Sequence, residues 1–132
     1  MSPQDILAVV IAKQLEHPEL RQPPTWSELR RVIAREDVDI LVAPLPRPAQ
    51  LVQYGGAWTI VISSEVAPSR YTYYALHELG HLWLHHDTTA ERWERVYTMD
   101  AAEPDGPREY EAEVFVAIIL GGLERFNFHI DG

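Results

Sequence analysis

One segment of 16 residues constrains the fold of this chain more than any other, because it combines a helical apolar pattern with clustered histidines. Residues 71–86 have the sequence YTYYALHELGHLWLHH and hold four of the chain's six histidines together with one carboxylate, Glu78. Leucines and Trp83 flank the polar residues, so we expect this helix to be buried on most sides. Histidine and glutamate side chains are costly to bury without a partner. The fold must therefore place a partner for them inside the core.

His77, Glu78 and His81 fit the pattern H-E-x-x-H. Residues four apart lie on the same face of a helix, so the two imidazole rings can direct ring nitrogens at one ion. The carboxylate of Glu78 can reach a water at that ion without binding the ion itself. The pattern predicts that His77 and His81 are metal ligands and that Glu78 is a catalytic base. An amphipathic helix with a polar stripe is the alternative interpretation, and it would leave these groups without a partner.

A catalytic zinc ion takes three protein ligands and keeps a fourth position open. His85 and Asp87 follow the motif and are candidates for the third ligand. However, His85 continues the same helix, and three ligands stacked along one helix fit a tetrahedral ion poorly. Asp87 is expected to cap the next helix, and His86 to be exposed or capping. Gly80 costs about 1 kcal/mol relative to alanine inside a helix, which indicates that another backbone or a substrate approaches closely there.

A later helix offers a better third ligand in the sequence EYEAEVF, which contains Glu109, Glu111 and Glu113. Glu109 shares one helix face with three apolar residues, Ala112, Val116 and Ile119. A residue as small as Ala112 would let two helices approach closely beside an ion. We therefore predict Glu109 as the third ligand, with Glu113 as the second choice. All three glutamates could instead be solvated near the start of the helix, where negative charge is favourable.

The first 36 residues predict two helices. One is expected from Pro3 to about His17, and its apolar stripe comprises Leu7, Val10, Ile11 and Leu15. The second follows the sequence TWSE, in which Thr25 can cap the helix and Glu28 can complete a capping box. This second helix is expected to end near residue 36.

Short β-rich runs follow, and strands are expected at residues 39–43, 51–54 and 58–63. Gly55-Gly56 can adopt the positive φ angles of a tight hairpin between the last two strands. The histidine-rich helix, with Ser69 as its expected cap, comes next.

A short helix through about Tyr97 and a last helix from about Pro107 to Gly121-Gly122 complete the chain. The order αα-βββ-ααα predicts an α+β fold, in which a small, mainly antiparallel sheet packs with helices around the H-E-x-x-H helix.

The composition favours a single acidic globular domain over residues 1–132. The formal net charge is −9 and the one basic cluster comprises Arg30, Arg31 and Arg35, which argues against a nucleic-acid-binding surface. The absence of cysteine excludes disulfides, thiolate metal ligands and a cysteine nucleophile. No apolar run reaches the roughly 18 residues of a membrane span, and the first run, preceded by Asp5, makes a poor signal peptide. We expect a cytoplasmic protein without direct nucleic-acid or membrane contact.

The sequences RYTYYALHELGHLWLHH and EYEAEVFVAIIL resemble the motifs of the ImmA/IrrE family (DUF955) of small, gluzincin-like zinc metallopeptidases. The upstream hairpin and the order of elements are also similar, so the resemblance covers roughly residues 26–123. It implies that His77, His81 and Glu109 bind one Zn²⁺ ion and that Glu78 is the catalytic base. The chain departs from the family at Glu113, where asparagine is common in the family.

The resemblance implies a zinc-dependent metalloendopeptidase that acts on a protein, expected to be a DNA-binding transcriptional repressor of the helix-turn-helix class. Such a reaction also needs a hydrogen-bond donor for the developing oxyanion, and Tyr71, Tyr97 and His85 are candidates. The competing class is a metal-containing binding module that inactivates a regulator by direct interaction without cutting it. A closed structural zinc site would normally take four protein ligands. Replacement of Glu78 discriminates between the two classes.

Overall fold

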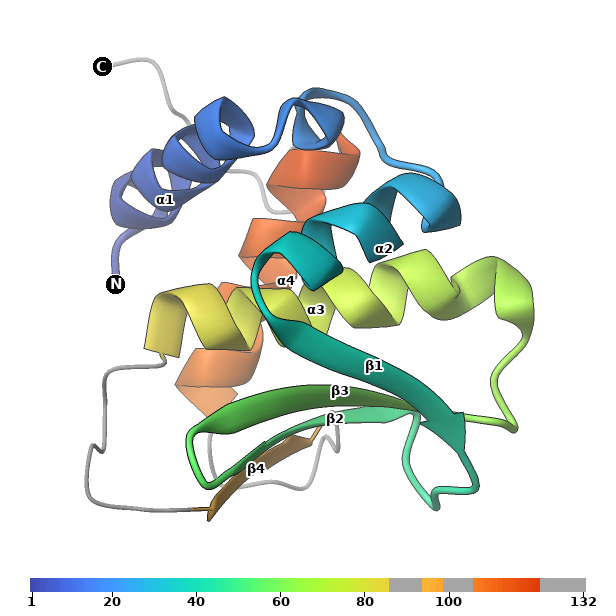
Figure 1. The fold of residues 1–132 in the computed structure, drawn as a ribbon. Helices are drawn as coiled ribbons and strands as arrows, with labels where there is room; N and C mark the ends of the chain where they lie inside the picture. Colours follow the sequence, from blue (N-terminus) through green and yellow to red (C-terminus); the bar gives the residue numbers. More distant parts are fainter. Residues whose placement is uncertain (86–93, 99–105, 122–132) are drawn as a thin grey trace.

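The computed structural model describes residues 1–85, 94–98 and 106–121, and it has the expected α+β fold (Figure 1). A four-stranded sheet forms one layer, and the helices pack against one face of it. No helix among these residues is both long enough and apolar enough to cross a membrane. The elements in chain order are α1 (Pro3–Glu16), the 3₁₀ helix η1 (Pro18–Arg21), α2 (Trp26–Arg35), β1 (Val38–Ala43), β2 (Ala49–Tyr54), β3 (Ala57–Ser63), the 3₁₀ helix η2 (Pro68–Arg70), α3 (Tyr71–His85), β4 (Glu94–Thr98) and α4 (Gly106–Leu120).

Capping boxes fix the starts of both N-terminal helices. The backbone N–H of Glu28 donates to the Thr25 hydroxyl, and the backbone N–H of Thr25 donates to the Glu28 carboxylate, as predicted. Ser2 and Asp5 form the same arrangement at the start of α1. Local sequence therefore determines where these two helices begin.

The buried face of α1 differs from the predicted stripe. Ile6 and Val10 are buried, whereas the side chains of Ile11 and Leu15 are 48% and 70% exposed. α1 packs against α4 and α3, so the positions of those helices decide which of its apolar residues are covered. Because α1 carries apolar residues on more than one side, helical periodicity did not identify the buried side.

The strands have the order β1-β3-β2-β4, in which β1 is parallel to β3 and the other two pairings are antiparallel. The predicted hairpin is confirmed, because Tyr54 pairs with Ala57 across a two-residue turn. Gly55 and Gly56 in this turn have φ angles of 58° and 87°, which suit a tight hairpin and are strained for other residues. The sheet is therefore mainly antiparallel, as its sequence predicts.

Two expectations about the middle of the chain are wrong. The segment containing Tyr97, expected as a short helix, forms the strand β4 and pairs with β2. Its sequence ERVYT is rich in β-branched and aromatic residues, and β2 has an edge available to pair with it. Ser69 does not cap α3, because η2 begins after Ala67 and leads directly into α3 at Tyr71. The turn expected after His86 lies outside the described residues.

α3 occupies the middle of the molecule, with the sheet on one side and α1 and α2 on the other, and α4 crosses it (Figure 1). Leu76 and Leu79 of α3 are fully buried, in the same cluster as Leu51 and Ile60 of the sheet and Phe115 of α4. The H-E-x-x-H residues therefore lie inside the core, as the apolar residues around them predict.

Candidate metal centre

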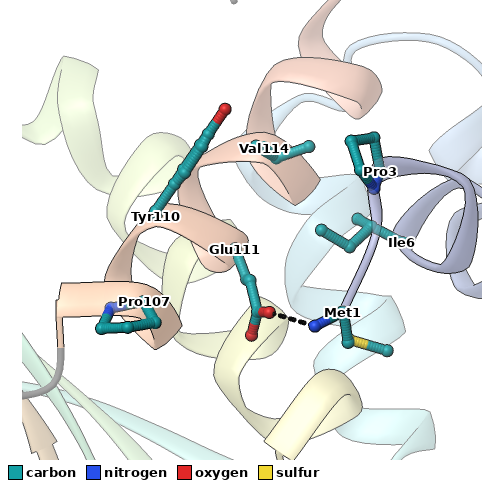
Figure 2. A pocket seen from close by; sticks show the side chains of 7 residues that line it. All are labelled: Met1, Pro3, Ile6, Pro107, Tyr110, Glu111 and Val114. Carbon is teal, nitrogen blue, oxygen red and sulfur yellow. Dashed lines mark hydrogen bonds and ion pairs between the residues drawn. The ribbon is translucent and has the colours of Figure 1, made fainter.

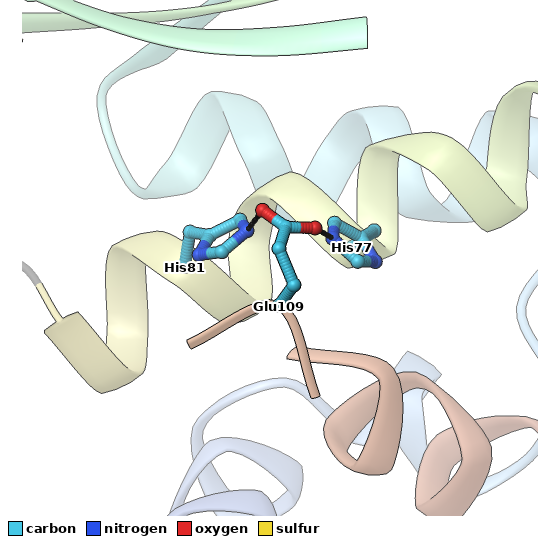
Figure 3. A group of neighbouring side chains, drawn as sticks. All are labelled: His77, His81 and Glu109. Atoms are coloured by element: carbon cyan, nitrogen blue, oxygen red, sulfur yellow. Dashed lines mark hydrogen bonds and ion pairs between the residues drawn. The ribbon is translucent and has the colours of Figure 1, made fainter. Parts of the chain in front are cut away.

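α3 and α4 bring His77, His81 and Glu109 together (Figure 3). The Nε2 atom of His77 lies 2.9 Å from Oε2 of Glu109, and the Nε2 atom of His81 lies 2.8 Å from Oε1 of the same carboxylate. Both imidazole rings are 1% exposed and their centroids are 5.0 Å apart. Figure 3 shows the carboxylate between the two rings, with one oxygen facing each ring. Among the described residues, Glu109 is the glutamate that contacts both histidine rings.

A close approach of α3 and α4 makes this arrangement possible. A Cβ atom added to Gly80 would lie 3.1 Å from Cδ1 of Phe115 and 3.5 Å from Cα of Ala112. Any side chain at residue 80 would therefore meet α4. Ala112 lies one turn after Glu109 on the same face of α4 and is fully buried. Gly80 and Ala112, the small residues expected to allow close packing, therefore lie at the contact between α3 and α4. This contact determines how far the Glu109 carboxylate lies from the two histidine rings.

The three side chains fit a divalent metal ion. Their possible ligand atoms all lie within 4.8 Å of one another, and two imidazole nitrogens with one carboxylate oxygen form a common donor set of catalytic zinc. Ligand atoms around a tetrahedral zinc ion are about 3.3 Å apart, which requires only small side-chain shifts here. Burial of both rings would also exclude competing water from the ion.

Electrostatics already favour positive charge between the three residues. Burial alone would lower the pKa of His77, but hydrogen bonding to Glu109 and the nearby carboxylates of Glu113 and Glu78 outweigh it and raise the pKa to about 9. Burial would raise the pKa of Glu109, but its bonds to His77 and His81 dominate and lower the pKa to about 2. Positive charge beside Glu109, whether on protonated histidines or on a metal ion, therefore stabilises its negative carboxylate.

Glu78 lies beside this cluster in a different environment. Its side chain is 0% exposed, and neither carboxylate oxygen has a hydrogen-bond partner among the described residues. Burial raises its pKa to about 8, with a further increase from the negative charge of Glu109 and an opposing effect from His77. A carboxylate with two unused oxygens is able to accept and release a proton, which fits the role that its place in the motif predicts.

A tyrosine–glutamate contact lies one helical turn from the histidine cluster, and the sequence did not predict it. The Tyr73 hydroxyl lies 2.5 and 2.7 Å from the two oxygens of Glu113, and Oε1 of Glu113 is 3.4 Å from Nδ1 of His77. Burial and the negative charge of Glu113 raise the pKa of Tyr73, so its hydroxyl keeps its proton and donates to the carboxylate. The signal that could have revealed the contact is the shared spacing of four residues in Tyr73–His77 and Glu109–Glu113.

The other candidates from the sequence are not part of this cluster as described. Glu111 points toward the residues just before α1, where its carboxylate pairs with the Met1 amine at 2.7 Å. Tyr71 packs edge-on against Trp26, with ring centroids 5.5 Å apart. Residues 86 and 87 and the side chains of residues 85 and 97 lie outside the described part of the structure, so the oxyanion donor stays a prediction.

The far side of α4 carries a pocket of about 270 Å³ between α1 and α4 (Figure 2). Apolar side chains form most of its wall, and the ion-paired residues Met1 and Glu111 also line it. Tyr110 and Val114 of α4 line this pocket, whereas Glu109 and Glu113 face α3. α4 therefore separates the pocket from the histidine cluster.

A second histidine–carboxylate group, formed by Glu16, His17 and Glu36, resembles a metal site only in composition. The Lys13 ammonium lies 3.2 Å from Glu16 and 3.3 Å from Glu36, so a cation already occupies the group. Glu36 also accepts hydrogen bonds from Nε2 of His17 at 2.9 Å and from Nε1 of Trp83 at 2.8 Å. These contacts form an ion-pair and hydrogen-bond network that joins α1 and the end of α2 to Trp83 of α3.

Comparison with known proteins agrees with the resemblance inferred from the motifs. A search of curated proteins finds no match. The family model of the IrrE N-terminal-like domain (Peptidase_M78) matches residues 33–121, which is more than half of the chain and contains α3 and α4. The chain therefore belongs to the IrrE N-terminal-like domain family of peptidases, the ImmA/IrrE family that its H-E-x-x-H helix resembles.

Proposed function

We propose that this protein is a zinc-dependent metalloendopeptidase, with His77, His81 and Glu109 holding one Zn²⁺ ion and Glu78 acting as the general base. One observation carries the proposal: two buried imidazole nitrogens face a single carboxylate that comes from a different helix. Membership of a peptidase family supports a metallopeptidase-type activity and a protein substrate. The donor set supports zinc, since two imidazoles and one carboxylate are typical of catalytic zinc and leave a position open.

Each residue then has a defined task. The bound ion would polarise the scissile carbonyl and make a water more acidic. Glu78 accepts one proton from the water that attacks the carbonyl carbon, and it returns that proton to the nitrogen of the leaving amine. Its two oxygens are free for this transfer because no described side chain donates to them. Burial of the two histidines keeps bulk solvent away from the reacting groups.

The substrate is proposed to be a transcriptional repressor of the helix-turn-helix class, in the cytoplasm. The resemblance to the ImmA/IrrE family supports this choice. The net charge of −9 disfavours contact between this chain and nucleic acid, so recognition would involve the repressor protein alone.

Replacement of Glu78 by glutamine tests the proposal. We expect Glu78→Gln to retain zinc and the fold but to lose cleavage of a candidate repressor by about 10²- to 10⁴-fold, the usual contribution of a general base. Glu65→Gln, a change of the same kind at an exposed glutamate, should leave cleavage unchanged. If Glu78→Gln inactivates the repressor as well as the wild type does, the protein acts as a binding module and the peptidase proposal is wrong.

A further inference from the structure

Two parallel contacts join α3 to α4, and only one of them has a role so far. His77 lies one turn after Tyr73 on α3, and Glu113 lies one turn after Glu109 on α4. His77 meets Glu109, and Tyr73 meets Glu113. Glu113 is about one-third exposed, yet its carboxylate turns toward the buried side of the helix rather than into solvent. The second contact therefore lies directly behind the first metal ligand.

The ring of His77 needs an acceptor on this side. Its Nε2 atom faces Glu109, and its Nδ1 atom is buried with no hydrogen bond of ordinary length to any described residue. A neutral imidazole that binds a metal through Nε2 carries its proton on Nδ1, and a buried N–H without an acceptor is costly. Oε1 of Glu113 lies 3.4 Å from Nδ1, close enough for a small shift to complete the bond.

We propose that Glu113 is a positioning residue for the metal site: it accepts the Nδ1 proton of His77, while the Tyr73 hydroxyl fixes the orientation of the Glu113 carboxylate. This inference rests on the proposed function, because it assumes that His77 binds the ion through Nε2. A carboxylate behind a histidine ligand holds the ring in one tautomer and makes its metal-binding nitrogen more basic. Tyr73 contributes because it donates to both oxygens of Glu113 and so restricts rotation of the carboxylate.

A purely structural role for Glu113 makes different predictions. If the Tyr73–Glu113 contact only joins two helices, its removal lowers the free energy of unfolding and leaves the His77 tautomer and the zinc affinity unchanged. If Glu113 positions His77, zinc affinity falls by about 10- to 100-fold, the usual effect of removing such a partner.

Zinc affinity is measured by competition with a chromophoric chelator, and the His77 tautomer by nitrogen NMR of protein labelled at the imidazole nitrogens. We expect Glu113→Ala to weaken zinc binding by about 10- to 100-fold and Tyr73→Phe by about tenfold, the lower end of the same range. Glu113→Gln should lose less affinity than Glu113→Ala, because its amide oxygen can still accept from Nδ1. Glu111→Ala is the matched control on the same helix, and its affinity should equal that of the wild type, because Glu111 faces α1.

Glu109→Ala separates the possible failures. Suppose that the wild type binds zinc and that Glu109→Ala does not. If Glu113→Ala then has the same zinc affinity as Glu111→Ala, Glu113 has no positioning role, although the proposed metal site is correct. If NMR shows that His77 binds zinc through Nδ1, the positioning role is also wrong. If the wild type binds no zinc, both the proposed function and this inference are wrong. Should Glu113→Ala not fold, Tyr73→Phe and Glu113→Gln decide the question, since each changes only a terminal group.

Discussion

A methyl group at Gly80 should disturb the candidate metal site by displacing the helix that carries Glu109, because Gly80 lies directly against α4. A Cβ atom there would be 3.1 Å from Cδ1 of Phe115, whereas carbon atoms prefer a separation of about 3.5–4.0 Å. Phe115 is fully buried and packs against Trp83, so its ring has little room to move. Gly80→Ala should therefore push α4, and with it Glu109, away from α3 by several tenths of an ångström.

Two opposing contributions determine how much Gly80→Ala changes the free energy of unfolding. Overfilling a packed core costs about 1–3 kcal/mol, and alanine is favoured over glycine in a helix by about 1 kcal/mol. We expect Gly80→Ala to lower the free energy of unfolding of the metal-free protein by about 1 kcal/mol and to weaken zinc binding as well. Urea denaturation measures the first effect and chelator competition the second.

A double-mutant cycle with Phe115→Leu tests the cause. The smaller side chain should make Gly80→Ala less harmful, with a coupling of about 1 kcal/mol and a partial return of zinc affinity. Gly55→Ala is the control, because a Cβ there meets no atom of the described residues within 4 Å and its cost comes from the φ angle of 58°. Its effect should add independently to that of Phe115→Leu. If Gly80→Ala is neutral or stabilising, and its effect simply adds to that of Phe115→Leu, then the contact between residue 80 and Phe115 does not control how closely α3 and α4 approach.

Three further results are expected. Glu36→Ala should lower the free energy of unfolding, measured by urea denaturation, by about 2–5 kcal/mol, because it leaves the donors of His17 and Trp83 without an acceptor. Glu16→Ala in the same network should lower it by less than about 1 kcal/mol. Equal effects of the two substitutions would contradict this. Burial would raise the pKa of Glu36, but hydrogen bonds from His17, Trp83 and Lys13 hold it below its usual 4.5, so its stabilisation is present above pH 4.5 and is lost as the pH falls through its folded pKa. The stability difference between the wild type and Glu36→Gln should therefore shrink below pH 4.5, and a constant difference would argue against this. Zinc at 100 times its dissociation constant should stabilise the fold by about 2.7 kcal/mol, an increase in melting temperature that EDTA reverses; no response to EDTA would count against metal binding.

Much of the candidate site could be predicted from the sequence because it depends on helical periodicity. The spacing of His77 and His81 places them on one face, and the apolar residues that share a face with Glu109 indicate which glutamate turns inward. Gly80 was expected at a close approach for the same local reason. The capping box at Thr25 and the Gly55-Gly56 turn are likewise local, since each is decided by residues within a few positions of one another.

The parts that could not be predicted depend on contacts between distant segments. The strand β4 forms because β2 has an edge to pair with, which a short run of residues does not reveal. The buried side of α1 is chosen by the helices that it packs against, and Ile11 and Leu15 have no such neighbour in the part of the chain that the structure describes. The Tyr73–Glu113 contact needs the crossing of α3 and α4 to be known, because the four-residue spacing on each helix does not by itself show which residues of the two helices meet.

Anomalous X-ray diffraction at the zinc edge, from crystals of the zinc-loaded protein, shows whether His77, His81 and Glu109 bind one zinc ion. We expect one strong peak per chain, bonded to Nε2 of His77, Nε2 of His81 and a carboxylate oxygen of Glu109, with one further position open to solvent. A peak at other residues, or two imidazole rings that turn to different neighbours with no peak between them, would contradict it.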